Sequence, residues 1–155
     1  SPHYRKLKEM VESGMVGEVI SFEFNETLGF NHGGYIHADW RRLTTVAGTH
    51  LLEKCCHDID LANWIIDSKA KRVASFGGVN FFKPENARRI QELGTDENGN
   101  KAYSTWPRSG DKEIDPFTAD KDIVDNQVAI IEYANDVRAT FHTNCNSGNW
   151  GMHLY

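Results

Sequence analysis

The sequence contains little cysteine, no long apolar run and no cluster of basic residues. Its formal net charge is -5, and no run of lysine or arginine exceeds the pairs Arg41–Arg42 and Arg88–Arg89. Nucleic-acid binding needs a basic cluster, so we expect no nucleic-acid partner. The apolar runs are shorter than the ~20 residues of a membrane-spanning helix, and no segment resembles a signal peptide. We therefore expect no membrane partner.

The three cysteines, Cys55, Cys56 and Cys145, do not form a C-x-x-C motif. Adjacent residues on a helix point about 100° apart, so Cys55 and Cys56 would form a disulfide only with strain. We predict reduced, buried thiols in a cytoplasmic protein. The motifs G-x-G-x-x-G, G-x-S-x-G and the P-loop are also absent, so the sequence contains no dinucleotide-binding unit.

The 155 residues, 39% hydrophobic and 25% charged, predict one domain with a sizeable core. Apolar–polar alternation predicts two strands, the runs on either side of Asn135–Asp136 predict two more, and helical periodicity predicts two helices. The strands are expected at 18–27, 71–82, 124–134 and 137–146, and the helices at 4–13 and 49–67. Gly14 should end the first helix in the left-handed conformation, and Asn135–Asp136 should form a tight hairpin turn. Residues 28–47 and 83–122 are loop-like, with one helical turn near 87–93. This order predicts an α+β fold: an open, mostly antiparallel, mixed β-sheet with helices packed on one face.

The segment 48–64, GTHLLEKCCHDIDLANW, spaces its ionisable residues three or four positions apart. On one continuous helix these residues would share a face. They are His50, Glu53, His57 and Asp60, beside an apolar side made of Leu52, Cys55, Cys56, Ile59 and Ile66. Glu53 could then accept a hydrogen bond from His57 and leave the other ring nitrogen free for proton transfer. The alternative interpretation is a solvated polar face with ordinary i, i+4 pairs.

The pattern H-x-x-E-x-x-x-H in this segment also suggests a metal site. His50 and His57 are seven residues apart, roughly 10 Å along a helix, which is too far for one ion. We therefore predict no metal. The preceding loop allows two interpretations, a polar pocket or a core tryptophan beside a surface arginine. The residues concerned are His32, Tyr35, His37, Trp40 and Arg41.

The run EKCCHDID, residues 53–60, resembles the second domain of the glucose–fructose oxidoreductase / inositol dehydrogenase / MocA (GFO/IDH/MocA) family. Members of that family carry a glycine-containing loop, then a helix with acid-x-x-x-His-x-x-Asp and a nearby tryptophan. These positions are here Gly48, Glu53, His57, Asp60 and Trp64. The triplet Asp39-Trp40-Arg41 resembles the loop before that helix, and the likeness covers most of the chain.

The resemblance implies the second domain of a two-domain dehydrogenase that transfers a hydride between NAD or NADP and a sugar, polyol or related alcohol. It implies that His57 transfers the proton, that Glu53 is its neighbour at the substrate, and that Trp40, Arg41 and Asp60 contact the substrate. Residues 1–155 would form the substrate-binding and oligomerisation domain. The cofactor would be bound by the protein's own Rossmann domain, which is missing from the fragment. Other copies of the chain would bind through the sheet.

The chain begins SPHYRKLKEM without an initiator methionine, which fits either a fragment of a longer protein or a processed chain. We expect the isolated fragment to be inactive. The alternative from another class is a non-catalytic domain that dimerises through its sheet or has a regulatory role. In that alternative the polar helix face is structural.

Overall fold

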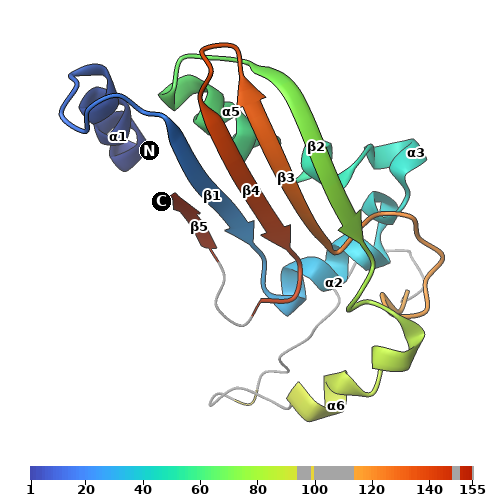
Figure 1. Ribbon diagram of the computed structural model, residues 1–155. Helices are drawn as coiled ribbons and strands as arrows, with labels where there is room; N and C mark the ends of the chain where they lie inside the picture. The colour runs from blue at the N-terminus through green and yellow to red at the C-terminus, as the bar shows by residue number, and fades with distance from the viewer. Residues whose placement is uncertain (94–98, 100–113, 148–150, 155) are drawn as a thin grey trace.

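The computed structural model describes residues 1–93, 99, 114–147 and 151–154. Its central element is a five-stranded sheet with the order β2-β3-β4-β1-β5 (Figure 1). The strands are β1 (Ser21–Thr27), β2 (Ala70–Gly78), β3 (Asn126–Tyr133), β4 (Arg138–Asn144) and β5 (Gly151–Leu154). β1 is parallel to β4, and the other pairs are antiparallel. The predicted α+β class, with a mixed and mostly antiparallel sheet, is confirmed. The short β5 was not predicted.

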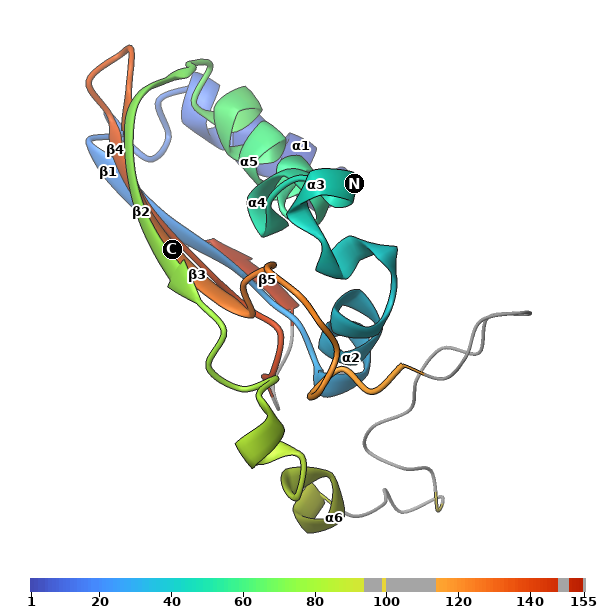
Figure 2. The same cartoon turned by 90° about the vertical axis from the view of Figure 1, so that its right-hand side faces the viewer.

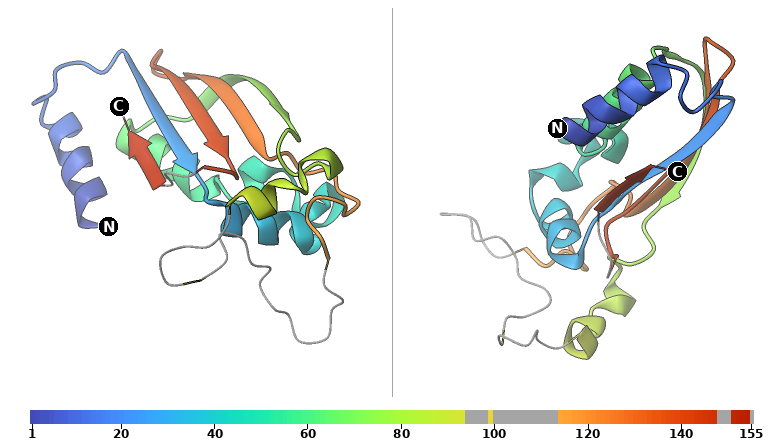
Figure 3. Two further views of the ribbon diagram at one scale, coloured as in Figure 1. Left: turned by 90° about the horizontal axis from the view of Figure 1, so that it is seen from below. Right: turned by 90° about the vertical axis from the view of Figure 1, so that its left-hand side faces the viewer.

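Helices cover one face of this sheet, as the edge-on view in Figure 2 and the right panel of Figure 3 show. The helices on this side are α1 (Pro2–Glu12), α2 (Phe30–Ala38), η1 (Trp40–Arg42), α3 (Thr44–Ala47), α4 (His50–Glu53) and α5 (Cys56–Ile65). Two short helices follow β2, η2 (Pro84–Asn86) and α6 (Arg89–Leu93), and α6 lies beyond the end of the sheet. Within the described ranges, no helix covers the opposite face of the sheet. None of the helices in those ranges combines the length and apolar character needed to cross a bilayer.

The main core lies between the sheet and α5. Along β3 and β4 every second residue is buried, because alternate side chains of a strand point to opposite faces. The rings of Phe24 and Phe141 lie 4.5 Å apart between neighbouring strands. The other buried members of this cluster are Cys55, Ala62, Ile65, Ile66, Ala129, Ile131, Tyr133, Val137 and Ala139.

Two predicted chain reversals are confirmed. Gly14 has φ 72° after α1, a conformation that glycine adopts without a Cβ clash. Between β3 and β4, Asp136 has φ 64°, and the amide of Tyr133 donates to the carbonyl of Val137. Aspartate tolerates this conformation better than most residues, so the hairpin turn agrees with its sequence.

The prediction of a loop over 28–47 is wrong, because this segment forms α2, η1 and α3. The helix α2 packs against the end of β4 so closely that a Cβ on Gly33 would lie 2.0 Å from the carbonyl oxygen of Cys145. Glycine here permits a close contact rather than a flexible loop. A second core cluster forms around this contact and contains Leu28, Ile36, Phe82, Phe117, Ile123 and Cys145.

The prediction of one continuous helix over 49–67 is also wrong. The side chain of Thr49 caps α4, and the chain leaves the helix at Lys54 before α5 begins at Cys56. The break allows both His50 and Cys55 to be fully buried. It also leaves Leu52, 65% exposed, and Cys56 outside the core, contrary to the predicted apolar side and to the prediction that all three thiols are buried.

The long segment 83–122 lies only partly within the described residues. The helical turn predicted near 87–93 corresponds to α6 (Arg89–Leu93). Residues 94–98 and 100–113 lie outside the described ranges.

Candidate active site

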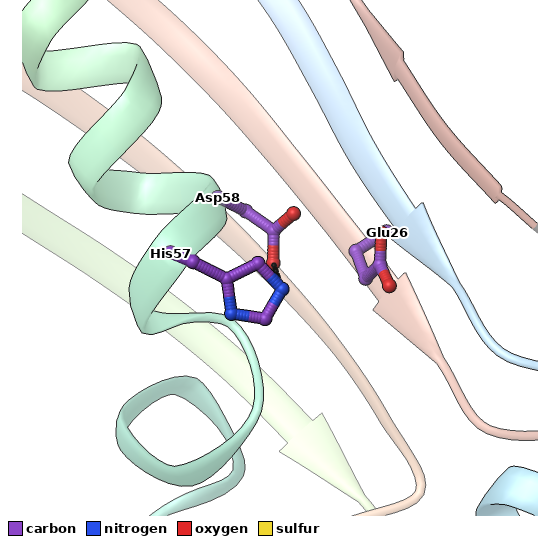
Figure 4. A group of neighbouring side chains, drawn as sticks. All are labelled: Glu26, His57 and Asp58. Carbon is purple, nitrogen blue, oxygen red and sulfur yellow. Dashed lines mark ion pairs between the residues drawn. The ribbon is translucent and has the colours of Figure 1, made fainter. Parts of the chain in front are cut away.

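A cluster of four ionisable side chains joins the end of β1 to the start of α5. The Lys54 Nζ atom lies 2.7 Å from Oε1 of Glu26 and 3.4 Å from Nε2 of His57. Nε2 of His57 lies 3.5 Å from Oδ2 of Asp58. In Figure 4 Glu26 extends from β1 toward the two residues on α5. We call these four residues the Lys54 cluster.

The strand and the helix break explain why these residues meet. On β1 the side chains of Phe22, Phe24 and Glu26 follow the two-residue period and face the helices. The third of them, Glu26, is a carboxylate, and a buried carboxylate needs a charged or hydrogen-bonding partner. The break between α4 and α5 puts Lys54 opposite it, and both side chains are only 12% exposed. Glu26, Lys54 and Asp58 were not among the predicted site residues, although a carboxylate on an apolar strand face such as that of β1 indicates a buried polar contact.

Burial controls the electrostatics of this cluster. The Asp58 side chain is fully buried, and neither of its oxygens accepts a hydrogen bond from the described residues. Burial and the charge of Glu26 raise the pKa of Asp58 to about 7, although Lys54 acts in the opposite direction. Burial disfavours the charged form of Lys54, but the hydrogen bond and charge of Glu26 outweigh it and raise the pKa of the lysine. The cluster thus combines a fixed ion pair with a carboxyl group that titrates near neutral pH.

Glu53 is bonded to Arg41 rather than to His57. Nε of Arg41 donates to Oε1 of Glu53 over 2.6 Å, and Nη1 donates to Oδ2 of Asp39 over 2.7 Å. The guanidinium lies 4.4 Å above the ring of Trp40. No hydrogen bond joins Glu53 to His57 among the described residues, because the two lie on different helices. The predicted orientation of His57 by Glu53 is therefore replaced by contacts with Asp58 and Lys54.

The polar and aromatic residues of α2 and η1 divide between a polar surface and the core. The hydroxyl of Tyr35 lies 2.7 Å from Nε2 of His32, and Arg41 lies 5.5 Å from the Tyr35 ring. Burial and then the charge of Lys54 lower the pKa of His32. Trp40 is 40% exposed, so it is not a core residue. His37 is fully buried and stacks on Phe82, and it lies apart from this polar group.

The four residues predicted to share one helix face are dispersed. His50 is fully buried, with Nε2 3.1 Å from the hydroxyl oxygen of Thr143. Burial, followed by the charges of His37 and Lys54, lowers the pKa of His50 to about 4. The side chain of His57 is 55% exposed, and Asp60 is exposed. Of the predicted site residues, only His57 lies in the Lys54 cluster.

The residues of the H-x-x-E-x-x-x-H pattern do not converge on one point. Among the described residues, three groups of metal-binding type come within 4.8 Å of one another, on Glu26, His57 and Asp58. The ammonium group of Lys54 is already hydrogen-bonded to Glu26 and supplies the positive charge there. The chemistry of this set favours proton exchange over cation binding.

A cavity of about 460 Å³ lies elsewhere, between α1, β1 and α5. Its lining is mostly apolar and includes Leu7, Val11, Phe22 and Ile65. None of the predicted site residues lines it. Apolar walls do not suit a ligand rich in hydroxyl groups, which needs hydrogen-bonding partners.

Comparisons with known proteins agree with the fold. The family model described as GFO/IDH/MocA C-terminal domain matches residues 4–151. The "Putative oxidoreductase YteT" of Bacillus subtilis (strain 168) is 31% identical over 86 residues, which cover 56% of this chain and 20% of that protein.

Two solved structures are similar to the whole chain. Levoglucosan dehydrogenase in complex with NADH and levoglucosan has a TM-score of 0.64 at 16% identity, covering 97% of this chain and 34% of that one. The super-repressor mutant of Gal80p from Saccharomyces cerevisiae has a TM-score of 0.66 at 17% identity, covering 99% and 35%. The chain thus spans between about a fifth and about a third of the length of these relatives.

Proposed function

The chain belongs to the GFO/IDH/MocA C-terminal domain family, and from this membership we propose that it is the substrate-side domain of a nicotinamide-dependent oxidoreductase. The substrate is a sugar, polyol or related alcohol. A relative named as an oxidoreductase and a dehydrogenase of the same fold, solved with NADH and levoglucosan, support this proposal. NAD or NADP would be bound by a Rossmann domain outside this chain and would supply the hydride acceptor.

His57 is the proposed proton-transfer residue. Oxidation of an alcohol releases a proton together with the hydride, so the site needs a base close to the reacting hydroxyl group. The observation that carries this assignment is the position of the His57 ring: it is half exposed, and its Nε2 lies 3.5 Å from a buried carboxyl group. A ligand can reach the exposed side of the ring, while Nε2 on the other side contacts Lys54 and Asp58.

The other predicted site residues have different proposed roles. Trp40 and Asp60 are exposed, and both are proposed to contact a polyhydroxyl substrate. Glu53 holds Arg41, and Arg41 in turn stacks on Trp40. We propose that Glu53 and Arg41 act on the substrate by fixing the tryptophan ring.

The test is the variant His57→Ala in the protein that joins this chain to its nucleotide-binding domain. We expect kcat to fall roughly 10²–10⁴-fold, the usual contribution of a general acid–base group. The control is His3→Ala, which removes an exposed histidine on α1 and should leave kcat unchanged. Near-normal turnover of His57→Ala would refute the assignment.

A second candidate function is a non-catalytic domain that dimerises through its sheet or has a regulatory role. The observation that favours it is the open sheet face, where Phe76 is 84% exposed and Ile130 is 59% exposed. The similarity to the Gal80p repressor structure also fits it. If His57→Ala has no effect while disruption of the sheet face abolishes self-association, this candidate is favoured. Self-association through the sheet is compatible with the catalytic proposal as well.

A further inference from the structure

We propose that Asp58 is a positioning residue for His57 and that the two side chains hold one exchangeable proton between Nε2 and Oδ2. The Lys54–Glu26 ion pair fixes the charge around that proton. The catalytic meaning of this inference rests on the proposed function, but the proton exchange itself can be measured without turnover.

The geometry supplies two different environments for the proton. Oδ2 of Asp58 lies in a fully buried side chain, whereas the His57 side chain is 55% exposed. The separation of 3.5 Å slightly exceeds a normal hydrogen bond, so the proposed exchange requires the half-exposed ring to rotate toward Oδ2. The ring can therefore alternate between the buried carboxyl group and a ligand on its open side, while Asp58 never touches the ligand.

The proton balance of the exchange is simple. With the proton on Nε2, the pair consists of an imidazolium and a carboxylate. On transfer, the Nε2–H bond breaks and an Oδ2–H bond forms, which gives a neutral imidazole and a carboxylic acid. Both forms have the same net charge, and no electron is gained or lost.

Lys54 biases this equilibrium. Its ammonium group lies 3.4 Å from Nε2 and disfavours a second positive charge on the imidazole. The neutral imidazole can instead accept a hydrogen bond from the ammonium. The carboxylate of Glu26, 2.7 Å from Nζ, partly neutralises the charge of Lys54. Its own negative charge opposes ionisation of Asp58.

Charged and titratable groups face Asp58 from each element packed around it. Glu26 lies on β1, and Lys54 and Cys55 lie in the helix break. His57 precedes Asp58 on α5, and Tyr4 faces it from α1. Burial raises the pKa of the Tyr4 and Cys55 groups, so both stay neutral around pH 7. The charges that shift the pKa of Asp58 are therefore those of Glu26 and Lys54, and His57 is the neighbouring group that contacts its Oδ2.

The experiment is NMR of the chain with ¹³C-labelled aspartate and ¹⁵N-labelled histidine over pH 4–9. We expect the ¹³Cγ signal of Asp58 to titrate near pH 7, and we expect the ring-nitrogen signals of His57 to sense that step, because Nε2 lies 3.5 Å from Oδ2. Lys54→Met should move the Asp58 midpoint upward, and Glu26→Gln should move it downward, each by on the order of 1 pH unit. Exposed Asp60 provides the internal control in the same spectra.

Each other outcome is decisive. If Asp58 titrates in the acidic range of ordinary carboxyl groups, or if both variants leave its midpoint unchanged, the inference is wrong. Stoichiometric binding of Zn²⁺ that shifts Glu26, His57 and Asp58 together would also overturn it, since the cluster would then be a cation site. These results are distinguishable from failure of the proposed function, which is decided by the turnover of His57→Ala. Lys54→Met and Glu26→Gln leave Asp58 in place, so the test does not depend on folding of an Asp58 variant.

Discussion

Nε of Arg41 donates to Oε1 of Glu53 over 2.6 Å and so ties η1 to α4, although the residues are twelve positions apart in the chain. The same guanidinium group also bonds Asp39 and stacks on Trp40. One side chain therefore links Asp39, η1 and α4. Its planar arrangement of donors suits two carboxylates at once, which a lysine cannot match.

The first prediction is that Arg41→Lys lowers the free energy of unfolding by about 1–3 kcal/mol, because a largely buried, charge-assisted hydrogen bond is lost. The Arg41 side chain is only 24% exposed. Urea denaturation followed by tryptophan fluorescence measures the change. The matched control is Arg72→Lys on β2, whose side chain is 74% exposed and pairs with Glu132. It should cost less than about 1 kcal/mol. Equal losses in the two variants would contradict the role given to Arg41.

The strands could be predicted from the sequence because their signal is local. The segments that form β3 and β4 are rich in β-branched and aromatic residues and flank a turn, and these signals need no knowledge of distant partners. The hairpin at Asn135–Asp136 was predictable for the same reason. The strand β5 was missed because its four residues, 151–154, are too few for a period to be recognised.

The helix break could not be predicted in this way, because its causes are distant in sequence. His50 contacts Thr143, 93 residues away, and Lys54 pairs with Glu26, 28 residues away. The i, i+4 rule predicted one polar helix face for this segment. In the structure His50 contacts Thr143, Glu53 binds Arg41, and His57 lies beside Asp58. His57 was identified from its residue type and from a family resemblance. Its partner Asp58 became visible only when burial was known.

The second prediction concerns Asp58 and stability. The pKa of Asp58 is raised to about 7 by burial in the folded protein, against about 3.8 in the unfolded chain. Between these values the folded state binds the extra proton, so this group stabilises the fold at low pH and the contribution is lost as pH rises through 7. From pH 5 to pH 8 the wild type should lose roughly 3 kcal/mol through this group. The free energy of unfolding, measured by denaturation at both pH values, should not show this loss in Asp58→Asn. Asp60→Asn, which changes an exposed aspartate, should show the same loss as the wild type.

The third prediction has the opposite sign and concerns His50. Burial lowers the pKa of His50 to about 4 in the folded protein, against 6.5 in the unfolded chain. As pH falls from 6.5 to 4 the unfolded state binds more protons, so the fold should lose roughly 3 kcal/mol through this group. His50→Gln should flatten this part of the stability curve. His3→Ala, which changes an exposed histidine, should not. An acid limb unchanged in His50→Gln would show that the buried imidazole is not the group that titrates.

The last prediction concerns the open face of the sheet. Phe76 on β2 is paired with Val128 on β3, and the neighbouring pair is Ala74 with Ile130. Exposed Val128 and Ile130 alternate with buried Ala129 and Ile131, so these two and their partners lie on the opposite side of the sheet from the core. Figure 2 shows that the helices leave this face of the sheet uncovered. Burying a phenylalanine in an interface contributes about 1.5–3 kcal/mol, so Phe76→Ser should weaken self-association roughly 10- to 100-fold. Light scattering across a dilution series measures this, with Leu52→Ser as the control, since Leu52 is 65% exposed on the helical side. An equal effect of the two substitutions would point to general loss of apolar surface, and no effect of Phe76→Ser would exclude this face as the contact.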